Sequence, residues 1–270
     1  MEPSAFVDYL LTDENRLAGQ ALQELAGGEL DVLVVLGSGL AETVDDYEGW
    51  GAPLNVVKLS SLPGVLAPVA DGHRDELRTY VVDGLRIAVA LGRTHLYEGM
   101  GPGPVTALAR SAKAAGAKAA VLCNANGCLR DWELGDVMTI RDHVNLSSIS
   151  PFDGTVFLDT SNAWDPELTG ALKAVTQRSG NYALLRGPEF QTPLETRMLA
   201  EAGIDTVGMS TIMEALMLHA LGVRLCGMSV VSDLSFANTP TDPEAVVESA
   251  ARAHQVVLEG VNAVLHLLRV

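Results

Sequence analysis

The chain has 270 residues, of which 48% are hydrophobic and 19% charged, a composition that excludes a disordered protein. It contains 18 lysines and arginines against 34 aspartates and glutamates, a formal net charge of −16. This charge argues against a nucleic-acid or anionic-membrane partner, whereas a few cations in a pocket are enough to bind a small anion.

The three cysteines predict neither a disulfide framework nor a metal site. Cys123, Cys128 and Cys226 match no zinc-ligand spacing, and the sequence has no Cys-x-x-Cys or His-x-x-x-His pair. The stretch MEPSAFVDYL is acidic and lacks the basic start of a signal peptide, and no run approaches the roughly 18 apolar residues of a spanning helix. We therefore expect a cytoplasmic protein with buried thiols, no metal and no membrane contact.

Short apolar runs alternate with helical patterns along the chain. Nearly continuous runs of Val, Leu and Ile predict buried strands over 31–36, 79–82, 86–91, 119–124, 137–140, 182–185 and 223–231. Apolar residues at helical spacing predict helices over 14–26, 103–115, 166–179, 193–202, 211–221 and 242–268. The alternation predicts one α/β domain over 1–270, with a mixed, mostly parallel sheet flanked by helices.

Two serines lie where the end of a strand or the start of a helix offers backbone N–H groups. Ser38 belongs to LGSGL (36–40), which closes the first predicted strand and is compatible with an ordinary turn or with a phosphate-binding nest. Ser210 directly precedes the capping box that opens the helix predicted from Thr211, and such a helix start is a ready anion site. Neither stretch is a P-loop or a GxGxxG fingerprint.

The stretch GRTHLYEG (92–99) is richer in polar groups and follows the strand predicted over 86–91. Open α/β sheets bind their ligands at the carboxyl ends of the strands. Arg93 and His95 fall on the same side if the strand continues, and the planar fork of an arginine suits phosphate. An arginine in a surface ion pair is the alternative interpretation.

Taken together and in order, these and other stretches closely resemble the trimeric purine nucleoside phosphorylases over nearly the whole chain. They are LGSGL (36–40), DGH (71–73), GRTHLYEG (92–99), NANGCL (124–129), GDVMTIRDHVNL (135–146), GPEFQTPLETRML (187–199), VGMSTIMEAL (207–216) and SVVSD (229–233). The resemblance implies a nucleoside-phosphorylase-like fold and a homotrimer that needs no metal or organic cofactor. It also implies phosphorolysis of a purine nucleoside to the free base and (deoxy)ribose 1-phosphate, with inorganic phosphate as co-substrate.

The resemblance further implies roles for individual residues. Phosphate would be bound by Ser38, His73, Arg93, His95, Ser210 and the backbone of Ala125. The ribose would contact Tyr97, Met209 and His254, and the base would contact Phe190, Gln191, Asp233 and Asn126. Glu98 would orient His95, and the catalytic roles would fall to His95, Glu98 and Asp233.

Two departures from the family pattern concern the base. Gln191 replaces a glutamate that binds N1–H of a 6-oxopurine, and Asp233 replaces an asparagine that binds O6 and N7. Adenine accepts at N1 and donates from its 6-amino group, so a glutamine NH₂ and a carboxylate oxygen suit it, and we expect a preference for adenosine. In the alternative, Gln191 turns its carbonyl toward N1–H while a protonated Asp233 bridges O6 and N7, which preserves 6-oxopurine activity. A protonated Asp233 could also donate to N7 of the departing base.

Another departure is the loop after the HxNL stretch, which is shortened to 147–156. In the family this loop lends an aromatic side chain to the neighbouring subunit's site, and Phe152 is the candidate replacement. A methylthioadenosine phosphorylase is the nearest alternative function, but an imidazole at His254 facing an apolar thioether would lose its partner. A catalytically silent nucleoside-binding homologue is a further alternative, which the complete set of phosphate residues argues against.

Overall fold

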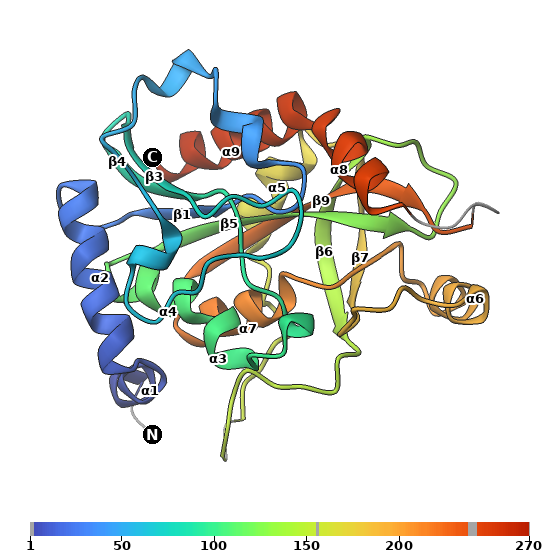
Figure 1. Cartoon of the computed structure of the whole chain (residues 1–270), viewed down its shortest axis with the longest axis horizontal. Coiled ribbons are helices and arrows are strands. Elements are labelled where there is room, and N and C mark those ends of the chain that lie inside the picture. The colour runs from blue at the N-terminus through green and yellow to red at the C-terminus, as the bar shows by residue number, and fades with distance from the viewer. Residues whose placement is uncertain (1–2, 155–156, 237–241, 270) are drawn as a thin grey trace.

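The computed structural model describes residues 3–154, 157–236 and 242–269. Its strands are β1 Val32–Val35, β2 Asn55–Val57, β3 Leu77–Val82, β4 Leu85–Ala90, β5 Ala119–Cys128, β6 Val137–Asn145, β7 Arg178–Leu184, β8 Thr206–Gly208 and β9 Arg224–Leu234. They form one sheet of order β2-β3-β4-β1-β5-β8-β7-β6-β9 (Figure 1). Five of the pairings are parallel and four antiparallel, so the predicted mixed sheet is confirmed.

Strand β5 has a special place in this sheet because it also pairs with β9. The strands β5, β8, β7, β6 and β9 therefore form a closed ring, and β1, β4, β3 and β2 extend from it as an open sheet. Strands β4, β1 and β5 run parallel to one another, so their carboxyl ends meet at one edge. This edge is where the sequence predicted a ligand.

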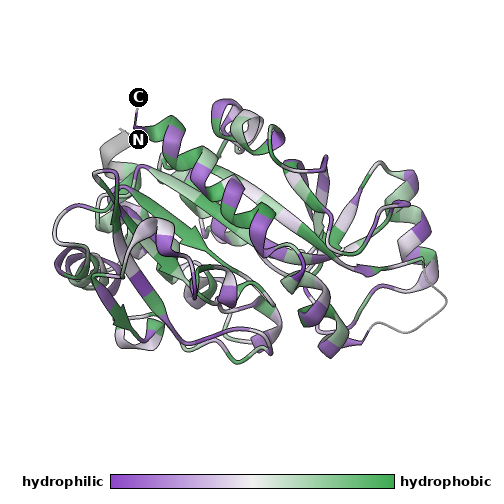
Figure 2. Cartoon of the chain, turned by 90° about the horizontal axis from the view of Figure 1, so that it is seen from above, coloured by the Kyte–Doolittle hydropathy of each residue, from purple (hydrophilic) through white to green (hydrophobic). Residues whose placement is uncertain are grey.

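Helices cover both faces of the sheet. Their bounds are α1 Pro3–Leu10, α2 Asp13–Ala26, α3 Pro102–Val105, α4 Ala107–Ala114, α5 Pro166–Lys173, α6 Pro193–Glu201, α7 Ile212–Ala220, α8 Pro243–Ala251 and α9 His254–Leu268. Alternate side chains of β1 separate two cores: Leu33 and Val35 pack with α2, α4 and α7, whereas Val32 and Val34 pack with α5 and α9. Figure 2 shows mostly hydrophobic strands between helices that carry hydrophilic stripes.

Three predicted helices are interrupted or shortened. The helix predicted over 103–115 divides at Thr106, whose hydroxyl donates back to the Pro102 carbonyl (2.9 Å). The one predicted over 166–179 ends at Lys173, because Arg178 already begins β7. The one predicted over 242–268 breaks into α8 and α9, where the backbone N–H of Ala253 bonds to the carbonyl three residues earlier.

Several strands are longer than predicted, and some short elements are new. Strands β5, β6 and β9 continue past their predicted ends at 124, 140 and 231 into polar residues such as Asn126 and Asp233, which hydropathy places outside a strand. The sequence did not predict α1, β2 or β8. None of the helices in the described ranges is long and apolar enough to cross a membrane.

Candidate functional site

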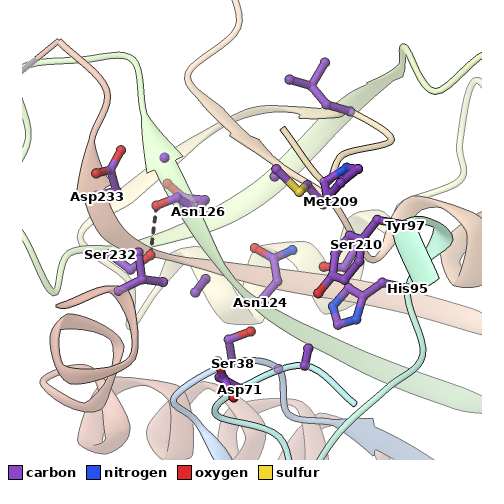
Figure 3. Close-up of a pocket in the computed structure, with 18 of the residues that line it drawn as sticks. Ser38, Asp71, His95, Tyr97, Asn124, Asn126, Met209, Ser210, Ser232 and Asp233 are labelled. Atoms are coloured by element: carbon purple, nitrogen blue, oxygen red, sulfur yellow. Dashed lines mark hydrogen bonds between the residues drawn. The ribbon is translucent and has the colours of Figure 1, made fainter. Parts of the chain in front are cut away.

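A cavity of about 560 Å³ lies at the predicted edge of the sheet, where segments that follow β1, β4, β7 and β8 converge on the ends of β5 and β9 (Figure 3). Of the site residues expected from the sequence, it is lined by Ser38, His73, Arg93, His95, Tyr97, Glu98, Ala125, Asn126, Phe190, Gln191, Met209, Ser210 and Asp233. Segments far apart in the chain thus meet around one space. Its two ends, called here the phosphate end and the base end after the residues expected there, differ in how they are built.

Arg93 is the central cation of the phosphate end, and its side chain is 2% exposed. Its Nε donates to Glu214 Oε1 (3.2 Å) and its Nη1 donates to the Cys123 carbonyl (2.6 Å). Its Nη2 is buried and has no hydrogen-bond partner within the described ranges. A Cβ at Gly37 would lie 3.0 Å from Nη1, so the glycine leaves room for the guanidinium. The arginine is therefore held rigidly with donor capacity to spare, and the alternative of a surface ion pair is wrong.

His73 and Ser38 form a hydrogen-bond chain that starts at Arg93. The Arg93 backbone N–H donates to His73 Nδ1 (3.1 Å), so a neutral His73 carries its proton on Nε2, which lies 3.0 Å from Ser38 Oγ. Burial and the neighbouring His95 and Arg93 lower the pKa of His73 well below its usual value of 6.5. The neutral His73 thus donates to Ser38 Oγ, which leaves the serine hydroxyl hydrogen for a ligand.

Ser210 is placed by the start of helix α7. The next residue, Thr211, has φ +77°, a conformation that is rare for a β-branched residue. It is held there because its N–H donates to Glu214 Oε2 (3.1 Å) and its hydroxyl accepts from Asn124 Nδ2 (2.8 Å). Glu214 therefore bonds both to Arg93 and to the turn that carries Ser210, and it fixes the two relative to each other.

His95 lies between Glu98 and Tyr97. Glu98 Oε1 accepts from the His95 backbone N–H (2.8 Å) and lies 3.2 Å from His95 Nδ1. A carboxylate only accepts, so Nδ1 carries a proton and Nε2 is free to face a ligand. The Tyr97 ring stacks on His95 at 4.7 Å, and burial together with Glu98 and Asp71 raises the pKa of Tyr97 to about 12. The tyrosine hydroxyl therefore remains a donor.

A buried polar chain joins the two ends along the floor of the cavity. Asn126 Nδ2 donates to Ser229 Oγ (2.8 Å), which donates to Asn124 Oδ1 (2.6 Å). Asn124 in turn donates to Thr211, whose hydroxyl lies 3.1 Å from Ser210 Oγ. In Figure 3, Asn124 lies between Asn126 and Ser210. The floor is fixed by side chains of the neighbouring strands β5 and β9 and by the turn before α7.

At the base end, β9 contains a one-residue bulge. Asn126 of β5 pairs with Val231, but Gly127 pairs with Asp233, so Ser232 is the additional residue. Side chains normally alternate across a strand, whereas here the consecutive residues Ser232 and Asp233 both line the cavity. Ser232 Oγ donates to the Asn126 carbonyl (3.0 Å), which holds the bulge in place (Figure 3).

Phe190 and Gln191 approach the base end from the segment between β7 and α6. Phe190 is 49% exposed, which leaves its ring face free for a planar ligand. Gln191 Nε2 donates to Ser235 Oγ (2.8 Å), and Ser235 Oγ donates to Asp233 Oδ2 (3.3 Å). The two side chains that depart from the family pattern are therefore linked by one hydroxyl.

His254 is the expected site residue that does not line the cavity. It is the first residue of α9, and its Nε2 lies 2.8 Å from the Gly39 carbonyl oxygen. The break between α8 and α9 changes the direction of the chain here, and Val246 and Val247 of α8 line the cavity instead. The expected ribose contact of His254 stays a prediction.

Several residues to which the sequence gave no site role support the site, among them Glu214, Thr211, Asn124, Ser229 and Ser235. The TIME sequence (211–214) was recognisable as a capping box, but nothing in it predicted that Glu214 would pair with Arg93. Ser235 follows β9 and carries no sequence signal. In the described ranges, no group of three or more His, Cys, Asp or Glu side chains is arranged to hold a metal ion.

Comparisons with known proteins agree with this geometry. Residues 32–266 match the family model described as Phosphorylase superfamily. A purine nucleoside phosphorylase of Mycobacterium tuberculosis is 40% identical over 230 residues, 83% of this chain and 85% of that protein. Purine nucleoside phosphorylase 1 of Bacillus subtilis is 30% identical over 250 residues, 86% and 90% of the two chains. A crystal structure of Schistosoma mansoni purine nucleoside phosphorylase in complex with adenosine has a TM-score of 0.85 at 25% identity, over 95% of this chain and 97% of that one.

Proposed function

The chain belongs to the purine nucleoside phosphorylase family, and on this premise we propose that it cleaves the N-glycosidic bond of purine nucleosides with inorganic phosphate. The products are the free purine and (deoxy)ribose 1-phosphate. The observation that carries the proposal is the buried Arg93, whose Nη2 has no hydrogen-bond partner among the described residues and whose backbone N–H starts the hydrogen-bond chain through His73 to Ser38. This end of the cavity offers donors and positive charge to a small anion.

The chain's own residues explain how the phosphate would react. Arg93, Ser38 and Ser210 donate to phosphate oxygens. Glu98 bonds to Nδ1 of His95, so the other ring nitrogen, Nε2, faces the anion. An oxygen of the phosphate then forms a bond to C1′ of the sugar, and the purine leaves with the electrons of the glycosidic bond. Because these donors are held before the ligand arrives, positioning and fixed charge supply most of the acceleration.

A substrate panel tests the proposed activity. Adenosine, inosine, guanosine and methylthioadenosine are incubated with the enzyme in the presence and absence of phosphate, and base release is followed. We expect release that depends on phosphate. Release without phosphate would indicate a hydrolase, and binding without any release would indicate a silent homologue; either result contradicts the proposal.

We further propose that the base site prefers adenosine over inosine. Gln191 can donate from its NH₂ group to adenine N1, and Asp233 can accept from the 6-amino group. Inosine offers the opposite polarity at both positions, and a site built for one pattern rejects its opposite because buried groups are left unpaired. In the same panel, kcat/KM is expected to be higher for adenosine than for inosine.

Methylthioadenosine is a second candidate substrate because of one structural observation. The argument against it depends on His254, and that imidazole bonds to the Gly39 carbonyl outside the cavity lining. Val246 and Val247, which do line the cavity, are apolar and compatible with a thioether. A higher kcat/KM for methylthioadenosine than for adenosine would make it the preferred substrate.

We also propose a cytoplasmic homotrimer. Phe152 packs against the main core and is unsuited to reach a neighbour, whereas Phe157 is 96% exposed and follows the shortened loop, of which residues 155–156 lie outside the described ranges. An aromatic side chain this exposed suits insertion into an adjacent subunit's cavity. Light scattering is expected to give three times 28.5 kDa, and a monomer would contradict the assembly.

The cytoplasmic location is supported by the cysteines. All three are buried and free, as expected of a protein from a reducing compartment.

A further inference from the structure

The hydroxyl of Ser235 lies between the two side chains to which base preference is assigned. It accepts from Gln191 Nε2 at 2.8 Å and donates to Asp233 Oδ2 at 3.3 Å. Gln191 comes from the segment before α6 and Asp233 from the end of β9, and the Ser235 hydroxyl bonds to both side chains. One serine therefore determines how an amide and a carboxylate from separate segments face each other.

The chemistry of the three groups gives this chain a single direction. A carboxylate accepts hydrogen bonds but cannot donate, so the one hydroxyl hydrogen of Ser235 goes to Asp233. The serine oxygen can then only accept from Gln191, which must present its NH₂ group rather than its carbonyl. The orientation of the amide thus follows from the hydrogen bond that Ser235 donates to Asp233 and not from the positions of the amide atoms alone.

The backbone around Ser235 holds the serine in this position. Its N–H donates to the Cys128 carbonyl at the end of β5 (3.0 Å). On the same strand, a Cβ at Gly127 would lie 2.5 Å from Ser235 Oγ and 3.5 Å from Asp233 Oδ2. A glycine opposite Asp233 in the bulge therefore leaves the space that the serine hydroxyl occupies.

We propose that Ser235 is a specificity-determining positioning residue that fixes the Gln191 amide with its nitrogen beside Asp233. The amide keeps its second N–H for N1 of adenine, and Asp233 keeps Oδ1 for the 6-amino group. N1 and the 6-amino group are neighbours on the edge of adenine. The Gln191 amide nitrogen and the Asp233 carboxylate are likewise neighbours, one on each side of the Ser235 hydroxyl. The inference rests on the proposed function and names the residue that sets its base preference.

The test is Ser235→Ala, with adenosine and inosine kinetics measured at saturating phosphate. Without the hydroxyl, the Gln191 amide is free to turn its carbonyl toward N1–H of inosine. We expect the adenosine-to-inosine ratio of kcat/KM to fall about tenfold, which equals about 1.4 kcal/mol. The KM for phosphate should not change, which separates this effect from a general loss of structure.

Three further variants complete the design. Ser235→Thr keeps the hydroxyl and should restore the ratio to near that of the wild type. Ser235→Cys fills the same space with a weak hydrogen-bonding group and should also lower the ratio. It therefore provides the test if the alanine variant fails to fold. The matched control is Ser60→Ala, which removes a hydroxyl that donates to Asp75 (2.6 Å) away from the cavity and should leave the ratio unchanged.

The outcomes distinguish a failure of the role proposed for Ser235 from a failure of the proposed function on which that role depends. If the wild type prefers adenosine and the folded alanine and cysteine variants keep its ratio, the role of Ser235 is overturned and the proposed function stands. If the wild type prefers inosine, both the base preference and the role of the serine are overturned. An Asp233→Asn background offers a second check, because there the loss of Ser235 should add little.

Discussion

Arg93 at the phosphate end is buried, ion-paired with Glu214 and bonded to the backbone of β5. At the base end, Phe190 is half exposed, and Gln191 bonds to one hydroxyl among the described residues. The phosphate-end groups are cross-linked through Glu214, Thr211 and Asn124. The base-end groups come from the end of β9 and from a segment beside α6, which Figure 1 shows away from the other helices.

This difference indicates where the chain tolerates change. A group that neighbours hold from several sides cannot be replaced without leaving buried partners unsatisfied. A group near the surface with one partner can be exchanged at lower cost. The phosphate end is therefore expected to be intolerant of substitution, and the base end is expected to change its preference while activity persists.

The largest effect is expected from Arg93→Ala. It removes the central cation and leaves Glu214 buried without its partner, so kcat/KM for phosphate should fall by about 10³-fold and stability by about 3 kcal/mol. Steady-state kinetics at varied phosphate and a thermal melt measure the two losses. Arg93→Lys should recover part of both, since it keeps the charge but not the fork.

The matched control for this prediction is Arg86→Ala. Arg86 lies on the same strand, β4, and donates to the Gly27 carbonyl (3.1 Å) outside the cavity. It should behave as the wild type toward phosphate. If Arg93→Ala also kept wild-type phosphate kinetics, the assignment of the phosphate end would be wrong.

A smaller effect, confined to preference, is expected at the base end. Asp233→Asn should lower the adenosine-to-inosine ratio of kcat/KM at least about tenfold, and adding Gln191→Glu should lower it further, because the pair then matches a 6-oxopurine. Phosphate KM should stay the same in both variants. Loss of activity toward both nucleosides, rather than a changed ratio, would mean that the base end is as intolerant as the phosphate end.

The smallest effect concerns the stability of the folded protein at acidic pH and is expected from His73 at the phosphate end. The pKa of His73 is lowered in the fold, so between that value and about 6.5 the unfolded chain binds a proton that the folded chain does not. Stability is therefore full above pH 6.5 and decreases as the pH falls below it. Melting curves from pH 7.5 to 5 should show this decrease, and it should be shallower in His73→Gln.

The pH dependence of the melting temperature that remains in His73→Gln is expected to come from His143. His143 also has its pKa lowered, chiefly by burial, so it contributes with the same sign. A wild-type melting temperature that stayed constant below pH 6.5 would contradict the neutral state assigned to His73.

The sequence predicted which residues line the cavity better than it predicted the bounds of the elements around them. Arg93 and His95 were placed together because two polar residues follow a buried strand, and local spacing was enough to predict that. The polar ends of β5 and β9 were missed because apolar runs mark a strand only while it faces the core. His254 was expected to contact the ribose from motif position alone; its Nε2 lies 2.8 Å from the Gly39 carbonyl oxygen, and the ribose contact stays a prediction.

Contacts between distant segments were beyond prediction. The pairing of Arg93 with Glu214 joins residues 121 positions apart, and the bridge from Gln191 to Ser235 spans 44 positions. Each depends on the register of strands that meet only in the folded sheet. The bulge at Ser232 has the same origin, because only the pairing of β5 with β9 reveals the additional residue.

The closed ring of five strands has a consequence for motion. Strand β5 lies inside the sheet, with β1 on one side and β9 and β8 on the other, so its amide hydrogens exchange with solvent only through costly openings of the sheet. Helix α6 packs mainly against a small satellite cluster and can open locally at less cost. In deuterium exchange, the cavity floor should therefore label last and α6 early, and a bound nucleoside should slow exchange mostly in the segment beside α6.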